Sequence, residues 1–303
     1  MNHDIDHPHH VGIVAVDLDE VSALYRRMGF DLTPPSHHVV ALKPGEEPKP
    51  LGTANVTAMF ERSYIELLAQ VREDVPMRVL APWLERFPGF HILALDSPDA
   101  DAVAARLDEV GIAHGGVGEL EREVDTPEGR QTLAFRTLMF GGEDLSAPVV
   151  WPDGGQPEGG VQAVQDRTPQ WLHQPRYMDH PNGAVDVSDY LLCVADAELE
   201  DFLRRYSKYL GRDPVVAGAR HVFELNGSRI TLVPAARLGE VLPGEEPASL
   251  PAFVAVEVAV RDLEAARRLV EASGLPLQSL EDGRFFVSAA AALGGAVIFA
   301  AAG

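Results

Sequence analysis

The sequence predicts an α+β protein in which four copies of one strand–helix–strands unit pair into two cup-shaped domains. The first sign is a repeat: residues 63–69 and 228–234 carry Ser, Ile and Leu at the same places, 165 residues apart. The second is that a strand, a helix closed by glycine and further strands recur from near residues 10, 90, 188 and 253. One such unit cannot cover both faces of its sheet, so two units are expected to close a curved sheet around a shared cavity.

The first unit begins with an apolar strand over residues 11–16. Asp17 and Asp19 suit the N-cap of the helix that follows, and Gly29 suits its end. The alternating residues 63–69 predict the last strand of this unit. The helical spacing rests on Val21, Leu24, Tyr25 and Met28.

The second unit repeats this order. Residues 90–95 predict its first strand, and residues 100–110 predict a helix that ends at Gly111. Strand-like pieces follow at residues 132–139 and 149–151.

The third and fourth units follow the same plan in the second half of the chain. The third has a strand over 190–194, Asp196 before a helix, and a stop at Gly211. The fourth has a strand over 253–260, a helix over 263–272 closed by Gly274, and strand-like pieces at 284–287 and 296–299.

A stretch rich in Pro, Gly and Trp, residues 151–183, separates the second unit from the third and has few strand or helix signals. We therefore expect an N-terminal domain at 1–155, a linker at 156–182 and a C-terminal domain at 183–303.

Composition excludes several classes of partner. Asp and Glu outnumber Lys and Arg, giving a net charge of −21, which disfavours nucleic acid and anionic membranes. Cys193 is the only cysteine, so the chain has no intramolecular disulfide. The N-terminus lacks the features of a signal peptide, and no apolar run is long enough to span a membrane. A cytoplasmic protein is expected, as a monomer or homodimer.

The motifs point to a family. The run from His10 to Asp19, the helix end Tyr25–Phe30, the pair of segments 52–55 and 64–68, and His180 to Gly183 resemble the vicinal oxygen chelate superfamily. That superfamily includes glyoxalase I, extradiol dioxygenases and antibiotic-resistance proteins, and the match is to its glyoxalase-like bacterial members. The resemblance implies βαβββ modules paired into mixed-sheet cups, often with a divalent metal inside.

In the family, metal ligands come from the first and last strands of each module. The resemblance places these positions on His10 and Glu66, and His91 has a similar setting at the start of the second module. A carboxylate in the apolar strand around Glu66 is costly unless it is paired or binds a cation. Two His and one carboxylate suit Fe, Zn, Ni or Mn. For His91 a core histidine bonded to backbone is the alternative reading.

Strand alternation puts His9 on the opposite face from His10. The fourth ligand of a glyoxalase I site is missing, because residues 149–151 are Val, Val and Trp. In the second half, Thr231 matches Glu66, while the places of His10 fall near Ser188 and Val254. We therefore expect a degenerate, metal-free C-terminal domain.

Four residues are candidates for binding substrate. Thr53 and Asn55 lie in a Gly-Thr-Ala-Asn segment that also suits a plain turn. Arg136 lies on a strand and suits an anionic substrate, or simply an exposed surface. His180 belongs to a segment that folds back over the first domain or forms a solvated turn.

The resemblance and these residues predict an enzyme acting on a small oxygen-bearing molecule. A metal acting as a Lewis acid, with Glu66 as ligand or as base, supports isomerase or lyase chemistry. An Fe(II) extradiol-type dioxygenase is the redox alternative. A metal-free protein that binds or sequesters a small molecule is the other.

Overall fold

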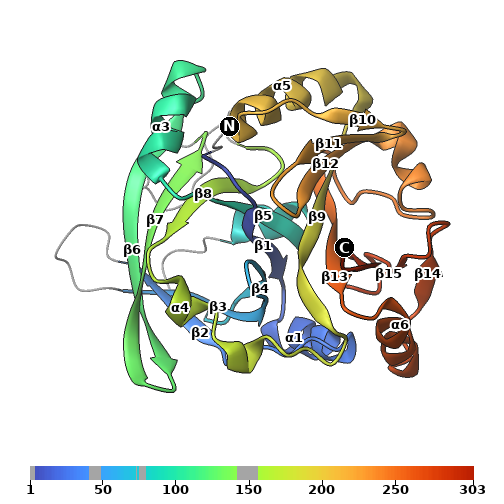
Figure 1. The fold of residues 1–303 in the computed structure, drawn as a ribbon, viewed down its shortest axis with the longest axis horizontal. Coiled ribbons are helices and arrows are strands. Elements are labelled where there is room, and N and C mark those ends of the chain that lie inside the picture. Colours follow the sequence, from blue (N-terminus) through green and yellow to red (C-terminus); the bar gives the residue numbers. More distant parts are fainter. Residues whose placement is uncertain (1–3, 41–48, 73, 75–79, 142–155) are drawn as a thin grey trace.

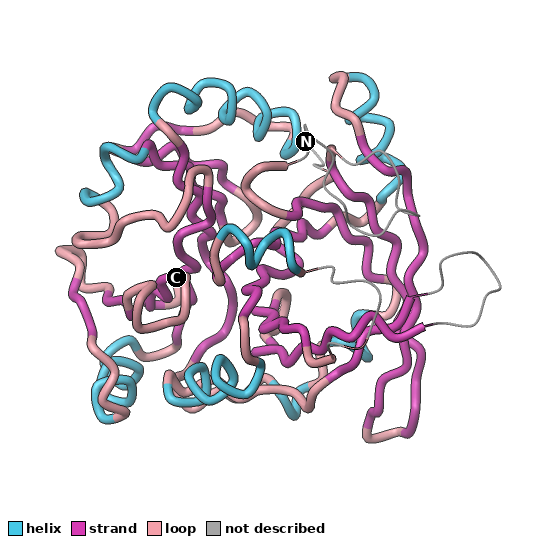
Figure 2. The backbone as a smooth tube through the Cα atoms, turned by 180° about the vertical axis from the view of Figure 1, so that it is seen from behind, coloured by secondary structure: helices cyan, strands magenta, loops and turns pink. Residues whose placement is uncertain are grey.

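A computed structural model describes residues 4–40, 49–72, 74, 80–141 and 156–303. Over these residues the strands form one 16-stranded mixed sheet, which curls into two cups lying side by side (Figure 1). Figure 2 shows most of the helices around the outside of the strands and one short helix near the middle of the view. The predicted α+β fold of four modules paired into two cups is confirmed.

The first cup contains two modules in the strand order β2-β3-β4-β1-β5-β8-β7-β6. In each module the first and last strands are parallel, and the antiparallel pair β1–β5 joins the modules. The elements are β1 (Pro8–Ala15), α1 (Leu18–Arg27), β2 (Ser36–Val40), β3 (Lys49–Met59), β4 (Tyr64–Gln70), α2 (Ala81–Arg86), β5 (Gly89–Asp96), α3 (Ala100–Glu109), β6 (His114–Thr126), β7 (Gly129–Phe140) and β8 (Gly160–Asp166).

The second cup repeats this plan in the order β10-β11-β12-β9-β13-β16-β15-β14. It is joined to the first where Phe253 of β13 pairs with Phe90 of β5. The elements are β9 (Ala184–Val194), η2 (Asp196–Glu198), α5 (Leu199–Leu210), β10 (Val215–Ala217), β11 (Arg220–Glu224), β12 (Arg229–Pro234), η3 (Ala235–Glu240), β13 (Ala252–Val260), α6 (Leu263–Ala272), β14 (Leu277–Ser279), β15 (Phe285–Val287) and β16 (Ala296–Ala301).

Local sequence explains the helix ends. The Asp17 carboxylate caps α1 by accepting hydrogen bonds from the backbone N–H groups of Asp19 and Glu20. Gly211 ends α5 with a positive φ of 64°, a conformation that glycine adopts without a Cβ clash. α6 spans the predicted residues 263–272.

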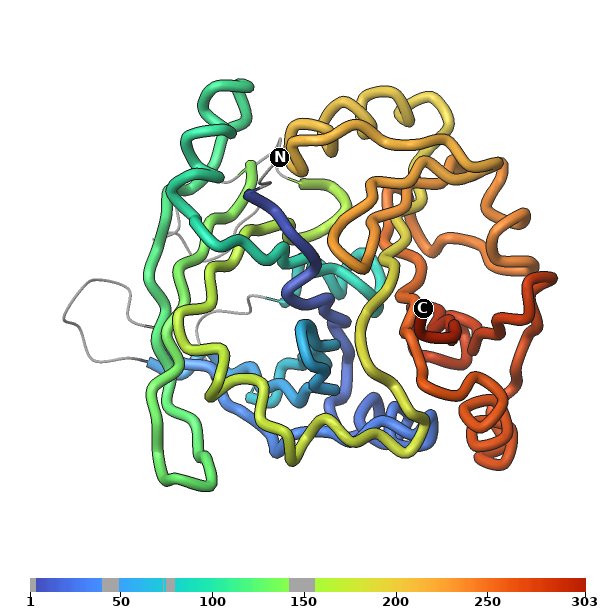
Figure 3. Tube along the Cα trace, in the orientation of Figure 1, coloured from blue at the N-terminus to red at the C-terminus, as the bar shows by residue number. Residues whose placement is uncertain are grey.

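The predicted linker is partly built into the first cup. Strand β8 lies inside residues 156–182 and pairs with β5 and β7, so this cup extends to Asp166. Short helices α4 (Pro169–Leu172) and η1 (Pro175–Tyr177) follow, and the chain runs along the lower rim of the cup to β9 (Figure 3). The strand predicted at 149–151 lies outside the described residues.

Alternation along each strand separates a helix-facing side from the inside of the cup. In β4, Ile65 and Leu67 join the main core with residues of α1 such as Tyr25. Tyr64 and Leu68 belong to other clusters on the opposite side of the sheet. Glu66, between Ile65 and Leu67, therefore faces the inside of the first cup. None of the helices among the described residues is long and apolar enough to cross a membrane.

Candidate active site in the first cup

Glu66 is the buried carboxylate of the first cup. It is 8% exposed and lies on β4, beside Gly12 of β1. The side-chain amide of Asn55, on β3, donates a hydrogen bond to its Oε1. This bond meets part of the cost of burying a charge. Asn55 lies within strand β3 and not in the predicted turn, so its side chain is fixed by the sheet.

His9 and His10 both lie in this site, and the prediction that His9 faces the other way is wrong. The pairing of β1 with β5 shifts register between Pro8 and His10, so His9 is the extra residue of a β-bulge. The two rings meet at their Nδ1 atoms, 2.8 Å apart. His10 also stacks on the Tyr64 ring, at 4.6 Å between ring centroids.

Burial sets the charge of these rings. It lowers the pKa of His10 to about 4, while Glu66 acts in the opposite direction. The pKa of His9 is also well below its usual value, through burial and then the neighbouring His10. Both imidazoles are therefore neutral near pH 7. A neutral imidazole has one nitrogen lone pair for a proton or a cation.

A third histidine, His38 of β2, belongs to the same group. Its Nδ1 lies 3.0 Å from Oγ1 of Thr53, a predicted binding residue that is buried on β3. Burial lowers the pKa of His38, and Glu66 opposes this, so the carboxylate acts on His38 as well as on His10.

Arg122 supplies the positive charge of the cup. It projects from β6, one edge of the curved sheet, and its Nη1 donates to Ser36 Oγ on β2, the other edge, at 3.2 Å. Its charge lowers the pKa of His9, His10 and His38. Among the described residues Arg122 has no ion-pair partner within 4.0 Å.

The structure places two predicted binding residues outside this group. Arg136 pairs with Asp101 of α3 through two hydrogen bonds of 2.7 and 2.9 Å. Leu138 and Phe140 lie two and four residues further along β7, on the same face as Arg136, and both belong to the main core. Arg136 therefore faces the helix side of the sheet. His180 accepts from the Asp31 N–H at Nδ1 and donates from Nε2 to the Met59 carbonyl, so both ring nitrogens are occupied.

His91 is also separate from His10 and Glu66. His10 faces Ala94 across β1 and β5, whereas His91 lies three residues before Ala94 in β5, at a second shift of register. Its Nε2 donates to the Phe87 carbonyl at 2.8 Å. Its ring packs against Phe87 and Trp83. His91 is thus a core histidine bonded to backbone, which is the alternative that the sequence analysis left open.

The donor set of the cup suits a divalent cation in kind. A neutral imidazole and a carboxylate are ligands for first-row metals, and metal-bound histidines usually donate their other ring N–H to a neighbour. His9 offers His10 such a neighbour. Over the described ranges, however, no three His, Cys, Asp or Glu side chains are grouped to hold a metal ion. The predicted trio is not assembled, and only His10 and Glu66 of its members share the cup.

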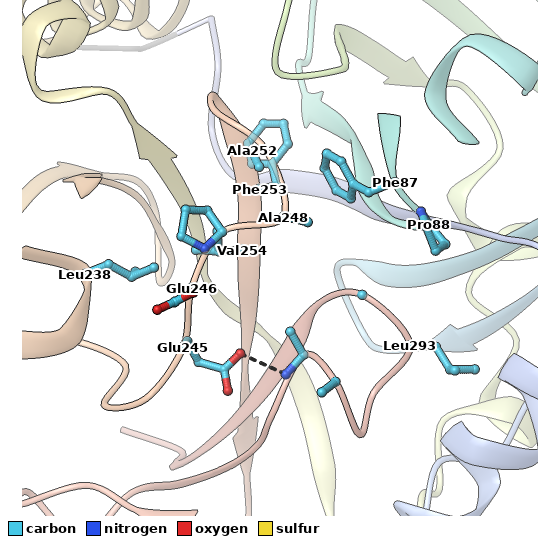
Figure 4. Close-up of a pocket in the computed structure, with 14 residues that line it drawn as sticks. Phe87, Pro88, Leu238, Glu245, Glu246, Ala248, Ala252, Phe253, Val254 and Leu293 are labelled. Atoms are coloured by element: carbon cyan, nitrogen blue, oxygen red, sulfur yellow. Dashed lines mark hydrogen bonds between the residues drawn. The ribbon is translucent and has the colours of Figure 1, made fainter. Parts of the chain in front are cut away.

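A separate cavity of about 360 Å³ lies between the two cups (Figure 4). Phe87, Leu238 and Phe253 line it, and its Glu245 accepts a hydrogen bond from the Ala289 N–H. No predicted site residue lines it, and of its two glutamates, Glu245 and Glu246, Glu245 is already bonded to backbone. We therefore do not assign the chemistry to this cavity.

Sequence reasoning missed Arg122, His38 and the role of His9. Arg122 stands between Glu121 and Glu123, a pattern typical of a solvated strand. His38 has no family position to mark it. The feature of the sequence that could have indicated it is the His37-His38 pair, which lies in the edge strand β2.

Comparisons with known proteins agree with the fold. The model of the glyoxalase-like domain matches residues 8–210. No curated protein sequence matches the chain. A hypothetical protein from Staphylococcus aureus is 11% identical, with a TM-score of 0.58 over 97% of this chain and 98% of that chain.

Two enzymes have similar structures. A Mn(II)-bound glyoxalase from Novosphingobium aromaticivorans is 14% identical, with a TM-score of 0.53 over 98% of this chain and 82% of that one. A mutant 4-hydroxymandelate synthase from Streptomyces coelicolor is 11% identical, with a TM-score of 0.57 over 99% of this chain and 94% of that one. At such identities these likenesses show a shared fold. With the family model spanning two-thirds of its length, the chain belongs to the glyoxalase-like domain family, and it has the fold of the vicinal oxygen chelate superfamily.

Proposed function

We propose that the first cup is the active site of a metal-assisted enzyme that moves a proton on a small, oxygen-bearing anion, in isomerase or lyase chemistry. The observation that carries the proposal is the buried carboxylate of Glu66, held by Asn55 beside the neutral ring of His10. A likeness in fold to a Mn(II)-bound glyoxalase supports the choice of a divalent cation.

His10 and Glu66 are the residues that would hold the cation. When bound there, it would polarise a substrate carbonyl as a Lewis acid. The Nδ1-to-Nδ1 contact needs one N–H and one lone pair. If His10 donates this proton to His9, its Nε2 lone pair stays available in the cup.

The other side chains have separate roles. The amide of Asn55 occupies Oε1 of Glu66, so Oε2 is the oxygen left to hold the cation or to accept the substrate proton, and Glu66 serves as ligand or as base. Arg122 binds the negative group of the substrate and fixes which carbon faces Glu66. Tyr64, stacked on His10, forms an apolar wall that keeps water away from the reacting atoms.

The test is the metal content of the protein, purified without an affinity tag. We expect one first-row ion per chain in the wild type, and its loss in His10→Ala and Glu66→Gln. His91→Gln is the matched control, because it removes a buried histidine of the same fold that lies outside the cup, and it should keep the ion. Metal-dependent turnover of small 2-oxo compounds should be lost with the ion.

Two results would reject this proposal. One is a wild-type protein that binds no ion after reconstitution with Fe, Zn, Ni or Mn. This result would favour a metal-free protein that binds a small molecule. The other is an ion retained in both His10→Ala and Glu66→Gln.

A further inference from the structure

The second cup has its own group of buried polar side chains. They lie at the strand-pairing positions equivalent to those of the site in the first cup. Tyr64 of β4 faces His10, and the equivalent residue of β12, Arg229, faces Asp189. Asp189, and not Ser188, therefore takes the place of His10. Across the module junction, His10 faces Ala94, whereas Asp189 faces Glu257.

The second cup thus places two carboxylates opposite each other, each only 2% exposed. Two arginines neutralise them. Arg229 bridges the pair, with Nε at 2.7 Å from Asp189 Oδ2 and Nη2 at 2.7 Å from Glu257 Oε1. Arg284 pairs with the other oxygen of Glu257 and, at 2.7 Å, with Asp282. Guanidinium groups therefore bind the buried carboxylates of the second cup. The first cup instead has the imidazole of His10 and the carboxylate of Glu66.

A third arginine, Arg220, is left over. It lines a cavity of about 510 Å³ together with Arg229 and Arg284. No described residue forms a hydrogen bond or ion pair with its guanidinium group. Burial and then the positive charge of Arg284 lower the pKa of Arg220. The negative charges of Asp189 and Glu257 act in the opposite direction and have smaller effects. The Arg220 side chain is part-exposed to this cavity, and its five N–H donors have no acceptor among the described residues, so water or an anion in the cavity must bind them.

The placement of the charges around the cavity, and not their sum, favours an anion at Arg220, because the lining has three arginines and the three carboxylates of Glu224, Glu257 and Asp282. Burial raises the pKa of Asp189 to about 7, and Arg229, which pairs with it, opposes this shift. Glu257 and Asp282 are engaged by Arg229 and Arg284. Glu224 also lines the cavity, but it is exposed and is not among the charges that shift Arg220. The remaining lining is small and apolar, including Val222 and Ala300.

From this juxtaposition we infer that the second cup binds a small organic oxyanion, a carboxylate or phosphate group with a short apolar body, with Arg220 as its principal donor. The chain then has two unlike small-molecule sites, one in each cup. The second does not depend on the chemistry proposed for the first.

The experiment is calorimetric titration of the full chain with succinate and with inorganic phosphate, at constant ionic strength against chloride. We expect saturable binding of at least one probe, weakened tenfold or more in Arg220→Gln because a charge-assisted bond is removed. The matched control is Arg204→Gln on α5, an exposed arginine that pairs with Asp201. It should bind as the wild type does.

The relative response to the two probes identifies the headgroup. Arg220 has no partner in the described part of the chain, so Arg220→Gln should fold, and an unchanged thermal midpoint without ligand checks this. Either probe should raise the midpoint of the wild type more than that of Arg220→Gln. Absence of saturable binding to both probes would overturn the inference, as would equal binding by Arg220→Gln and the wild type.

Discussion

The side-chain amide of Asn55 donates a hydrogen bond to Glu66 Oε1 across β3 and β4, inside the first cup. Both residues are buried, so neither can exchange its partner for bulk water. This bond orients the carboxylate and leaves Oε2 as the oxygen available to a substrate or a cation.

Asn55→Ala should lower the free energy of unfolding by about 1–3 kcal/mol, since it leaves a buried carboxylate without its donor. Urea denaturation measures this. The control is a double-mutant cycle with Glu66→Gln: if Asn55 acts through the charge of Glu66, its removal should cost less in the Glu66→Gln background. Equal costs in both backgrounds would show that the bond contributes nothing specific.

His10 should make the protein less stable in mild acid. Its pKa is about 4 in the folded chain and near 6.5 when unfolded, so between these values the unfolded chain binds the extra proton. The contribution of the neutral ring is fully present above about pH 6.5 and is lost toward pH 4, by about 3 kcal/mol in total.

The measurement compares the unfolding free energy of the wild type and His10→Gln from pH 7 to pH 4. Asp166, whose pKa is raised by burial to about 6, titrates in the opposite sense in this window, and the comparison cancels it. The advantage of the wild type over His10→Gln should shrink as the pH falls. A difference that stays constant with pH would mean that His10 is solvated.

Arg122 and Arg136 form a matched pair for substrate binding. Arg122 lies over the cup without an ion-pair partner among the described residues, whereas Arg136 is paired with Asp101 on the outer side. Binding of oxalate, measured in an Arg220→Gln background to silence the second cup, should weaken tenfold or more in Arg122→Ala. Arg136→Ala should bind oxalate unchanged. The reverse order would return the anion site to Arg136.

Local patterns in the sequence predicted most of the fold. The Asp17 cap and the glycine stops are contained within a few residues, so α1, α5 and α6 are found from sequence alone. Glu66 was singled out because the family resemblance marks its position and because an acid in an apolar strand is visible locally, and Asn55 because it belongs to the Gly-Thr-Ala-Asn segment.

The contents of the site depend on features that no local pattern records. A register shift brings His9 beside His10, and another sets His91 apart from them. Arg122 becomes important only because the sheet curls until β6 reaches β2. Asp189 was missed by one residue, because a strand pairing and not a motif defines its place.

Gly12 is expected to be intolerant of a side chain. A Cβ there would lie 2.8 Å from both Cβ and Cδ1 of Ile92, on the strand position beside Glu66. Gly12→Ala should therefore lower stability by about 1–3 kcal/mol through overpacking. Gly239→Ala is the control, because nothing lies within 4 Å of its Cβ. Similar thermal midpoints for the two variants would show that Ile92 moves aside at little cost.

The last prediction concerns Glu257, which joins Arg229 to Arg284 in the second cup. Glu257→Ala removes the shared partner of two part-buried cations and should cost about 3–5 kcal/mol, the range for breaking a buried ion pair on one side. Glu240→Ala removes an exposed carboxylate that also pairs with an arginine, Arg237, and should leave the unfolding midpoint unchanged. Urea denaturation of both variants gives the comparison. A loss for Glu257→Ala no larger than that for Glu240→Ala would mean that water solvates Arg229 and Arg284 in the cup.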